Sequence, residues 1–157
     1  MSEEALHHKI DRTGWEPGPW DNEPDRTDWE HAGLPCFALR NDLGSWCGYT
    51  GVPPGHPLYG KDYNAVDVSV HGGLTYCGAC SPPICHVPKP GEPDDVWWFG
   101  FDCGHFMDVM PGMEARLRRY EIRNRVFTED SQHPMCQYRT LDYVRAEVNS
   151  LAEQLAK

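Results

Sequence analysis

The amino-acid sequence predicts a single α+β domain with a mostly antiparallel sheet, two C-terminal helices and an irregular N-terminal arm. Three patterns indicate this fold class. Valines alternate with polar residues at 66–70, which is typical of a half-buried strand. An aromatic-rich apolar run at 96–101 predicts a second, more deeply buried strand. Apolar residues recur at intervals of three and four over 141–155, which predicts an amphipathic helix.

The first 32 residues form the predicted arm, and residues 33–157 form the predicted domain. Residues 1–30 contain nine acidic residues against three Lys or Arg, and prolines interrupt any regular element. The arm is therefore expected to contain neither a helix nor a strand. Its three tryptophans, Trp15, Trp20 and Trp29, either pack on the domain itself or dock on a partner protein.

Glycine and proline dominate residues 43–60, so we expect a long ordered loop there. Long loops often carry function, because the rest of a compact domain keeps its connections short. His56 and Tyr59 in this loop are therefore candidate ligand contacts.

Both predicted strands end at ionisable residues. The valine strand leads to His71, and the two glycines that follow allow close approach of the backbone. The aromatic strand is followed by four side chains of this kind, namely Asp102, Cys103, His105 and Asp108. Between the two strands, residues 77–95 hold five prolines and predict an irregular excursion.

Two helices are expected after the sheet. Residues 113–127 place apolar side chains at helical spacing. The helix over 141–155 has Thr140 as its predicted N-cap. Its narrow apolar stripe packs on the sheet, or on a second copy of the chain in a homodimer.

Length and composition exclude several protein classes. A chain of 157 residues is long enough for one hydrophobic core. No apolar run approaches the ~20 residues of a transmembrane helix, and the N terminus does not resemble a secretory signal. We therefore expect a cytoplasmic protein that binds no membrane, with its seven cysteines as thiols or metal thiolates. The net charge of −10 argues against binding of duplex nucleic acid.

His71, His105 and Asp102 form a predicted polar site that fits two chemistries. Without a metal, these three are the catalytic candidates, with His105 as general acid or base and Asp102 or Asp108 orienting it. With a metal, His71, Asp102, His105 and Asp108 coordinate zinc or another divalent ion that activates water. A third interpretation is that Asp108 only caps the following helix.

The cysteines offer an alternative zinc site. Cys77 and Cys80 have C-x-x-C spacing, and Cys85 and Cys103 follow along the chain, so four thiolates are available. The competing interpretation is that several of these cysteines are small core residues.

Five arginines lie within ten residues at positions 116, 118, 119, 123 and 125. Guanidinium groups bind phosphate through paired hydrogen bonds, so we expect Arg119 to contact a small phosphorylated ligand. The competing interpretation is a solvated helix face with Glu and Arg paired at helical spacing.

Four motifs occur in order along the chain: WCGYTGVPPGHPLYG at 46–60, VHGGLTY at 70–76, DVWWFGFDCGH at 95–105 and YVRAEV at 143–148. In this combination, residues 43–157 resemble a family of small uncharacterised proteins encoded by actinobacterial phages and prophages. The resemblance implies an accessory protein in the host cytoplasm, of the kind that sequesters or degrades a host nucleotide signal. It brings no settled activity.

We therefore expect a protein that binds a small polar or phosphorylated ligand. The expected contacts are His56, Tyr59, His71, Asp102, His105 and Arg119. One alternative is a metal-dependent hydrolase that acts on a phosphorylated small molecule. Another is an inhibitor or scaffold that binds a host protein through the tryptophan arm.

Overall fold

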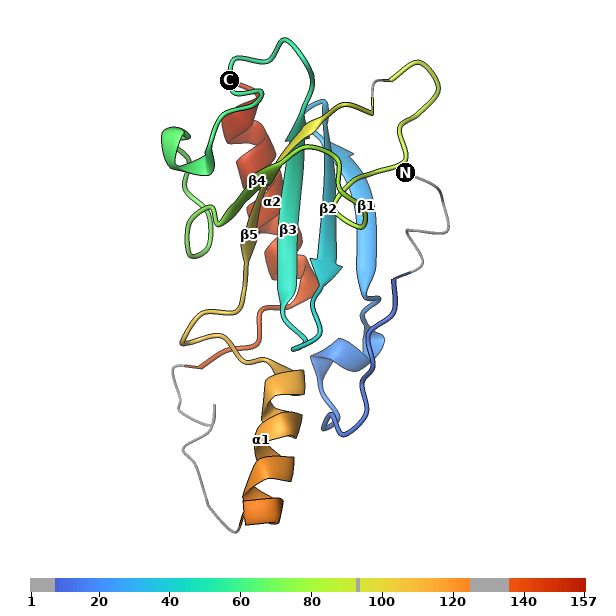
Figure 1. Ribbon diagram of the computed structural model, residues 1–157, viewed down its shortest axis with the longest axis vertical. Helices are drawn as coiled ribbons and strands as arrows, with labels where there is room; N and C mark the ends of the chain where they lie inside the picture. Colours follow the sequence, from blue (N-terminus) through green and yellow to red (C-terminus); the bar gives the residue numbers. More distant parts are fainter. Residues whose placement is uncertain (1–7, 93, 125–135) are drawn as a thin grey trace.

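The computed structural model describes residues 8–92, 94–124 and 136–157, and its strands form one antiparallel sheet in the order β1-β2-β3-β5-β4 (Figure 1). The strands are β1 (Arg26–His31), β2 (Leu34–Arg40), β3 (Trp46–Val52), β4 (Tyr76–Gly78) and β5 (Trp97–Asp102). The helices are α1 (Pro111–Asn124) and α2 (Leu141–Leu155), and 3₁₀ turns form at Pro19–Asn22 and Tyr63–Ala65. This arrangement confirms the α+β class.

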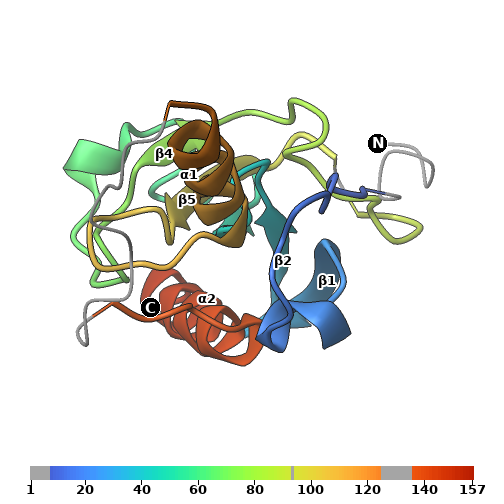
Figure 2. The same cartoon turned by 90° about the horizontal axis from the view of Figure 1, so that it is seen from below.

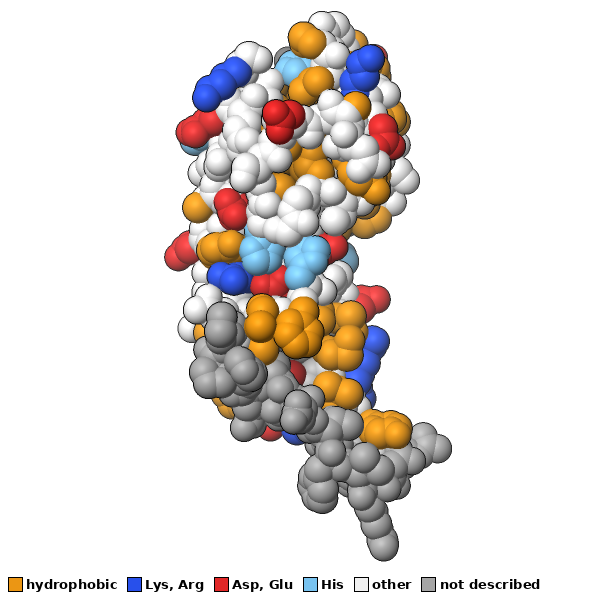
Figure 3. Space-filling view, turned by 90° about the vertical axis from the view of Figure 1, so that its left-hand side faces the viewer, with side chains coloured by type: hydrophobic (Ala, Val, Ile, Leu, Met, Phe, Trp, Pro, Cys, Tyr) orange, Lys and Arg blue, Asp and Glu red, His pale blue; other side chains and the backbone are white. Residues whose placement is uncertain are grey.

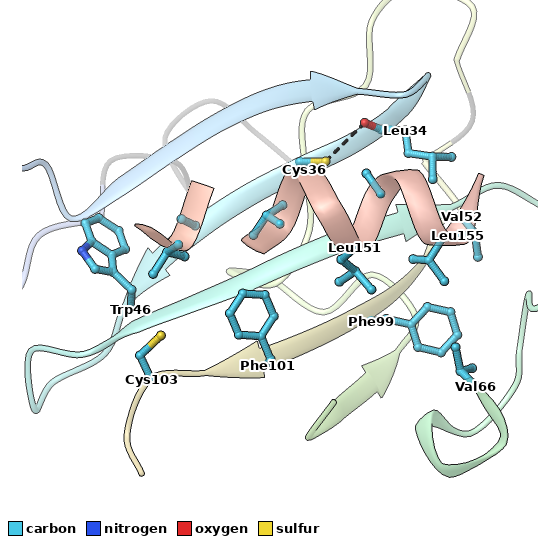
Figure 4. Close-up of a cluster of buried hydrophobic side chains, with 14 residues drawn as sticks. Leu34, Cys36, Trp46, Val52, Val66, Phe99, Phe101, Cys103, Leu151 and Leu155 are labelled. Atoms are coloured by element: carbon cyan, nitrogen blue, oxygen red, sulfur yellow. Dashed lines mark hydrogen bonds between the residues drawn. The ribbon is translucent and has the colours of Figure 1, made fainter. Parts of the chain in front are cut away.

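Helix α2 covers one face of the sheet (Figures 1 and 2). Its N-cap is as predicted, because the Thr140 hydroxyl accepts a hydrogen bond from the Tyr143 N–H at 3.2 Å. Val144, Val148 and Leu151 are fully buried in the core that α2 forms with the sheet (Figure 4). The chain's own sheet thus covers Val144, Val148 and Leu151, which is the first of the two arrangements expected for this stripe.

Strand β3 corrects the prediction of a loop over residues 43–60. It lies in the middle of the sheet, and only residues 43–44 and the residues after Val52 form turns as we expected. Its glycines allow close packing: a Cβ on Gly48 would lie 2.5 Å from Val148 of α2, and one on Gly51 would lie 2.3 Å from Val96. These glycines are there for packing and not for turns.

Strand β1 corrects the prediction that the arm contains no regular element. Its first residue, Arg26, is buried, which is possible because its guanidinium donates to Asp28 and to the carbonyls of Pro83 and Cys85, and lies over the Phe37 ring. Hydrogen bonds to every side of the guanidinium make burial of the charge tolerable.

Residues 66–70 do not form the predicted strand. Val66 is buried and Asp67 and Ser69 are exposed, so the alternation is real. The backbone, however, pairs with a side chain: Ser69 N–H donates to the Gln154 carbonyl oxygen at 2.8 Å, and the Gln154 amide donates to Ser69 C=O at 2.9 Å. An extended segment whose backbone bonds a helix side chain shows the same alternation of buried and exposed residues as a strand.

The second face of the sheet carries a smaller core of Phe37, Leu39, Tyr49, Val96 and Trp98. The irregular excursion after β4 lies against it, with the His86 ring edge-on to Trp98. Cys80 and Cys85 are joined by a disulfide in this excursion, so the expectation of thiols was wrong for this pair.

The N-terminal arm packs on its own domain. Trp20 is buried and its ring contacts Tyr138, and Trp29 in β1 donates to the Asn149 side chain of α2 at 2.8 Å.

Helix α1 extends beyond the lower end of the sheet in Figure 1. Among the described residues, no helix is long and apolar enough to cross a membrane.

Candidate functional site

A tight turn places His71 beside His105. Gly73 N–H donates to Val70 C=O at 2.9 Å, and Gly72 and Gly73 have φ of 69° and 79°, a conformation that favours glycine. A Cβ on Gly72 would lie 2.0 Å from His105 Nε2. The glycines therefore allow the His71 turn to pack directly against the His105 ring.

Both ring nitrogens of His71 have partners. Nε2 lies 2.8 Å from Asp108 Oδ2, and Nδ1 lies 2.8 Å from the Tyr143 hydroxyl oxygen. An ionised carboxylate only accepts, so Nε2 carries the proton that bonds Asp108. In neutral His71, Nδ1 therefore accepts the proton of the Tyr143 hydroxyl.

Asp108 holds the site together. Its side chain is buried and accepts hydrogen bonds from His71, from the His105 backbone N–H at 3.1 Å and from Arg139 Nε at 3.1 Å. Burial acts to raise the pKa of Asp108, but these hydrogen bonds outweigh it and lower the pKa. Asp108 is thus an ionised anchor, and the interpretation that it only caps the next helix is wrong.

His105 is the more accessible histidine. Its side chain is 39% exposed, against 13% for His71, and the two ring centroids are 5.7 Å apart. Its Nε2 is buried 3.1 Å from Asp102 Oδ1, but the geometry is not that of a hydrogen bond, and the atom has no hydrogen-bond partner among the described residues. Figure 3 shows histidine side chains side by side on this face, next to acidic and basic ones.

The histidine site, as we call it, consists of His71, Asp102, His105, Asp108, Arg139 and Tyr143. The structure brings together the four predicted polar residues and adds Arg139 and Tyr143. No sequence pattern links Tyr143 to His71, from which it is separated by 72 positions. Arg139 precedes α2 and is separated by 31 positions from Asp108, which it bonds.

Other predicted ligand contacts lie elsewhere. His56 accepts from Leu58 N–H and bonds the Leu155 carbonyl at 2.7 Å, so it caps the end of α2. Tyr59 packs against Trp97. Neither joins the histidine site.

The arginine cluster is also separate from the histidines. Arg116 and Arg119 line a hollow of about 310 Å³ between α1 and the arm, together with Asp11 and Asp42. Arg118 donates to Gly14 C=O. Arg125 and the side chain of Arg123 lie outside the described residues.

The structure does not assemble the alternative zinc site. Cys80 and Cys85 are bonded to each other, Cys77 lies in β4, and Cys103 is buried in the main core, where burial raises the pKa of its thiol. In residues 8–92, 94–124 and 136–157, no group of three or more His, Cys, Asp or Glu side chains is arranged to hold a metal ion.

Comparisons with known proteins find no matching family model, no similar curated protein and no similar solved structure.

Proposed function

We propose that the histidine site binds a small polar or phosphorylated molecule. The observation that carries the proposal is the convergence of the His71 ring, the His105 backbone N–H and the Arg139 guanidinium on the single buried carboxylate of Asp108. One anion orders three groups that can donate hydrogen bonds. The site is therefore assembled before a ligand arrives, which reduces the entropy lost on binding.

The donors favour an anionic group on the ligand. Arg139 is a permanent cation whose planar guanidinium lies over the Tyr143 ring, 4.7 Å from its centroid, so its orientation is fixed. His105 adds an exposed imidazole. Asp108 is already bonded, while Asp102, which is partly exposed, can accept hydrogen bonds from donors of the same ligand.

Metal-dependent hydrolysis has less support from the donor set. Both oxygens of Asp108 accept hydrogen bonds, and Arg139 would have to leave before a cation could take its place. Docking of a host protein by the tryptophan arm also has less support, because Trp20 and Trp29 contact the chain's own domain.

The role of a phage accessory protein that holds a nucleotide signal in the host cytoplasm is compatible with this binding. It rests on the motif resemblance alone, and the binding proposal does not depend on it.

Calorimetric titration with a panel of nucleoside mono-, di- and triphosphates and cyclic nucleotides tests the proposal. We expect at least one panel member to bind, and Arg139→Gln to weaken that binding by about tenfold or more, because it removes a charge-assisted hydrogen bond. The matched control is His31→Gln, which changes an exposed histidine that pairs with Glu153 outside the site. Equal affinity in Arg139→Gln and His31→Gln, or no binding by any panel member, would contradict the proposal.

A further inference from the structure

The geometry points to a further activity of the histidine site: cleavage of a bound phosphodiester by proton transfer without a metal, with His105 as general base and Tyr143 as general acid. The inference rests on the proposed function, because the same groups hold the phosphate. It assigns separate tasks to the two histidines, which differ in exposure and in hydrogen bonding.

Tyr143, His71 and Asp108 form a hydrogen-bonded chain that can deliver a proton. When His71 is protonated, its Nε2–H donates to Asp108 and its Nδ1–H donates to the Tyr143 oxygen, each across 2.8 Å. The hydrogen of the Tyr143 hydroxyl is then free to point away from His71, toward Glu147, 3.4 Å away, or toward a ligand. Burial and the charge of Glu147 raise the pKa of Tyr143, so the phenol keeps its proton until a leaving group takes it.

His105 has the complementary arrangement. The Asp102 carboxylate lies 3.1 Å from Nε2, and its negative charge favours the tautomer with the proton on that nitrogen although the two groups are not aligned for a hydrogen bond. Because Nε2 is buried while the side chain is partly exposed, Nδ1 is the nitrogen that remains to meet a ligand. In this tautomer Nδ1 carries a lone pair and accepts a proton.

The two groups both lie next to the His71 ring, and the inference is that one phosphate spans them. The His71 ring centroid lies 5.7 Å from that of His105 and 5.4 Å from that of Tyr143. Arg139, between Asp108 and the Tyr143 ring, supplies the cation that stabilises charge on the phosphate oxygens.

The reaction balances without a co-reactant. His105 Nδ1 takes a proton from water as the water oxygen bonds to phosphorus, and the bond from phosphorus to the leaving oxygen breaks. The leaving oxygen takes the proton of the Tyr143 hydroxyl, which takes the Nδ1 proton of His71. The products are a phosphomonoester and an alcohol, and exchange with solvent restores both histidines.

His105 must be neutral and His71 protonated at the start, so we expect a bell-shaped dependence of kcat on pH. The ionisable groups around the two rings are Asp102, Cys103, Asp108, Arg139, Tyr143 and Glu147.

The test uses the full chain with 2′,3′-cyclic and 3′,5′-cyclic nucleoside monophosphates and cyclic dinucleotides, in excess EDTA, with products separated by chromatography. We expect cleavage of at least one of them. Tyr143→Phe keeps the ring on which Arg139 lies and removes only the hydroxyl. It should lower kcat about 100-fold or more and remove the limb of the pH profile that reports the acid, and the affinity for the phosphorothioate analogue of the same nucleotide should stay within about threefold.

The outcomes separate the two proposals. Binding of the phosphorothioate without cleavage of any nucleotide would overturn the catalytic inference and leave the binding proposal standing. Loss of cleavage in EDTA, or full cleavage by Tyr143→Phe, would also overturn the inference. If neither binding nor cleavage occurs, both proposals fail. Circular dichroism melts of each variant, with His31→Gln as control, verify that loss of activity is not loss of folding.

Discussion

Two polar clusters of this molecule differ in how completely their groups are bonded. The arginine network consists of Arg12, Glu23, Asp25, Arg40 and Tyr138. Its centre, Arg40, is fully buried and donates to Asp25, Glu23, Tyr138 and the Gly44 carbonyl, with its guanidinium 4.4 Å from the centroid of the Trp46 ring. The histidine site also has a buried centre, Asp108, but His105 is partly exposed and its Nε2 has no hydrogen-bond partner among the described residues.

The difference favours a structural role for the arginine network and fits the ligand-binding role that we propose for the histidine site. In the arginine network every charge is bonded, and the bonds join the arm to the sheet: Arg12 donates to Asp25, and Asp25 accepts from Arg40. A cluster of this kind stabilises one conformation. In the histidine site the bonds fix the orientation of His71 and Arg139 and leave His105 for another molecule.

The largest effect on stability is expected from Arg40→Met. The substitution removes the cation beside Glu23 and leaves Asp25 with Arg12 alone, so the free energy of unfolding should fall by about 3–5 kcal/mol. Urea denaturation measures it. Lys89→Met is the control, because Lys89 pairs with Glu30 at the surface, where solvent screens the pair, and its loss should cost far less. Equal costs for the two variants would remove the distinction between the clusters.

Gly72→Ala should have the next largest effect, about 1–3 kcal/mol. An alanine there is strained by the positive φ of 69°, and its Cβ would displace the His105 ring. Gly60→Ala is the matched control, with φ of 77° and no atom within 4 Å of the new Cβ. The excess cost of Gly72→Ala over Gly60→Ala isolates the contact with His105, and a shift of the His105 ring signals in NMR spectra should accompany it. If the two alanines cost the same, the His71 turn does not pack on His105 in solution.

Local sequence patterns predicted the helices and strands whose formation depends mainly on residues within the element itself. Thr140 and the apolar stripe after it specified α2, and the aromatic run specified β5, because capping and burial there require only neighbours in sequence. Strand β3 was missed because Gly48 and Gly51 are read as turn residues until the side chains of Val148 and Val96 that pack on them are known. Four of the six residues of the histidine site were predicted. His71, Asp102, His105 and Asp108 follow apolar runs in the sequence, whereas Arg139 and Tyr143 reach them only through the tertiary fold.

Acid should weaken both clusters. Burial acts to raise the pKa of Asp25 and of Asp108, but in each case hydrogen bonds and cations outweigh it, and the pKa in the folded protein is lowered. Each carboxylate therefore contributes stability at neutral pH that is lost as pH falls through the unfolded value of about 3.9 and then the lower folded value.

Urea denaturation between pH 7 and pH 3 measures this loss. Asp108→Asn should make the dependence shallower, and Asp25→Asn should do so too. An unchanged pH dependence in Asp108→Asn would show that Asp108 is not held ionised by His71 and Arg139.

The smallest effect on stability, and the largest on activity, is expected from His105→Gln. Its side chain is partly exposed and its Nε2 has no hydrogen-bond partner among the described residues, so the free energy of unfolding should change by less than about 0.5 kcal/mol. Turnover should fall about 100-fold or more if His105 is the general base. His56→Gln gives the opposite pattern, because His56 Nε2 bonds the Leu155 carbonyl at the end of α2 and Nδ1 accepts from Leu58 N–H, and its loss should cost about 1–2 kcal/mol with turnover unchanged. A large loss of stability in His105→Gln would place His105 with the structural histidines, whereas a stable and inactive variant is the result expected if its Nδ1 serves a ligand.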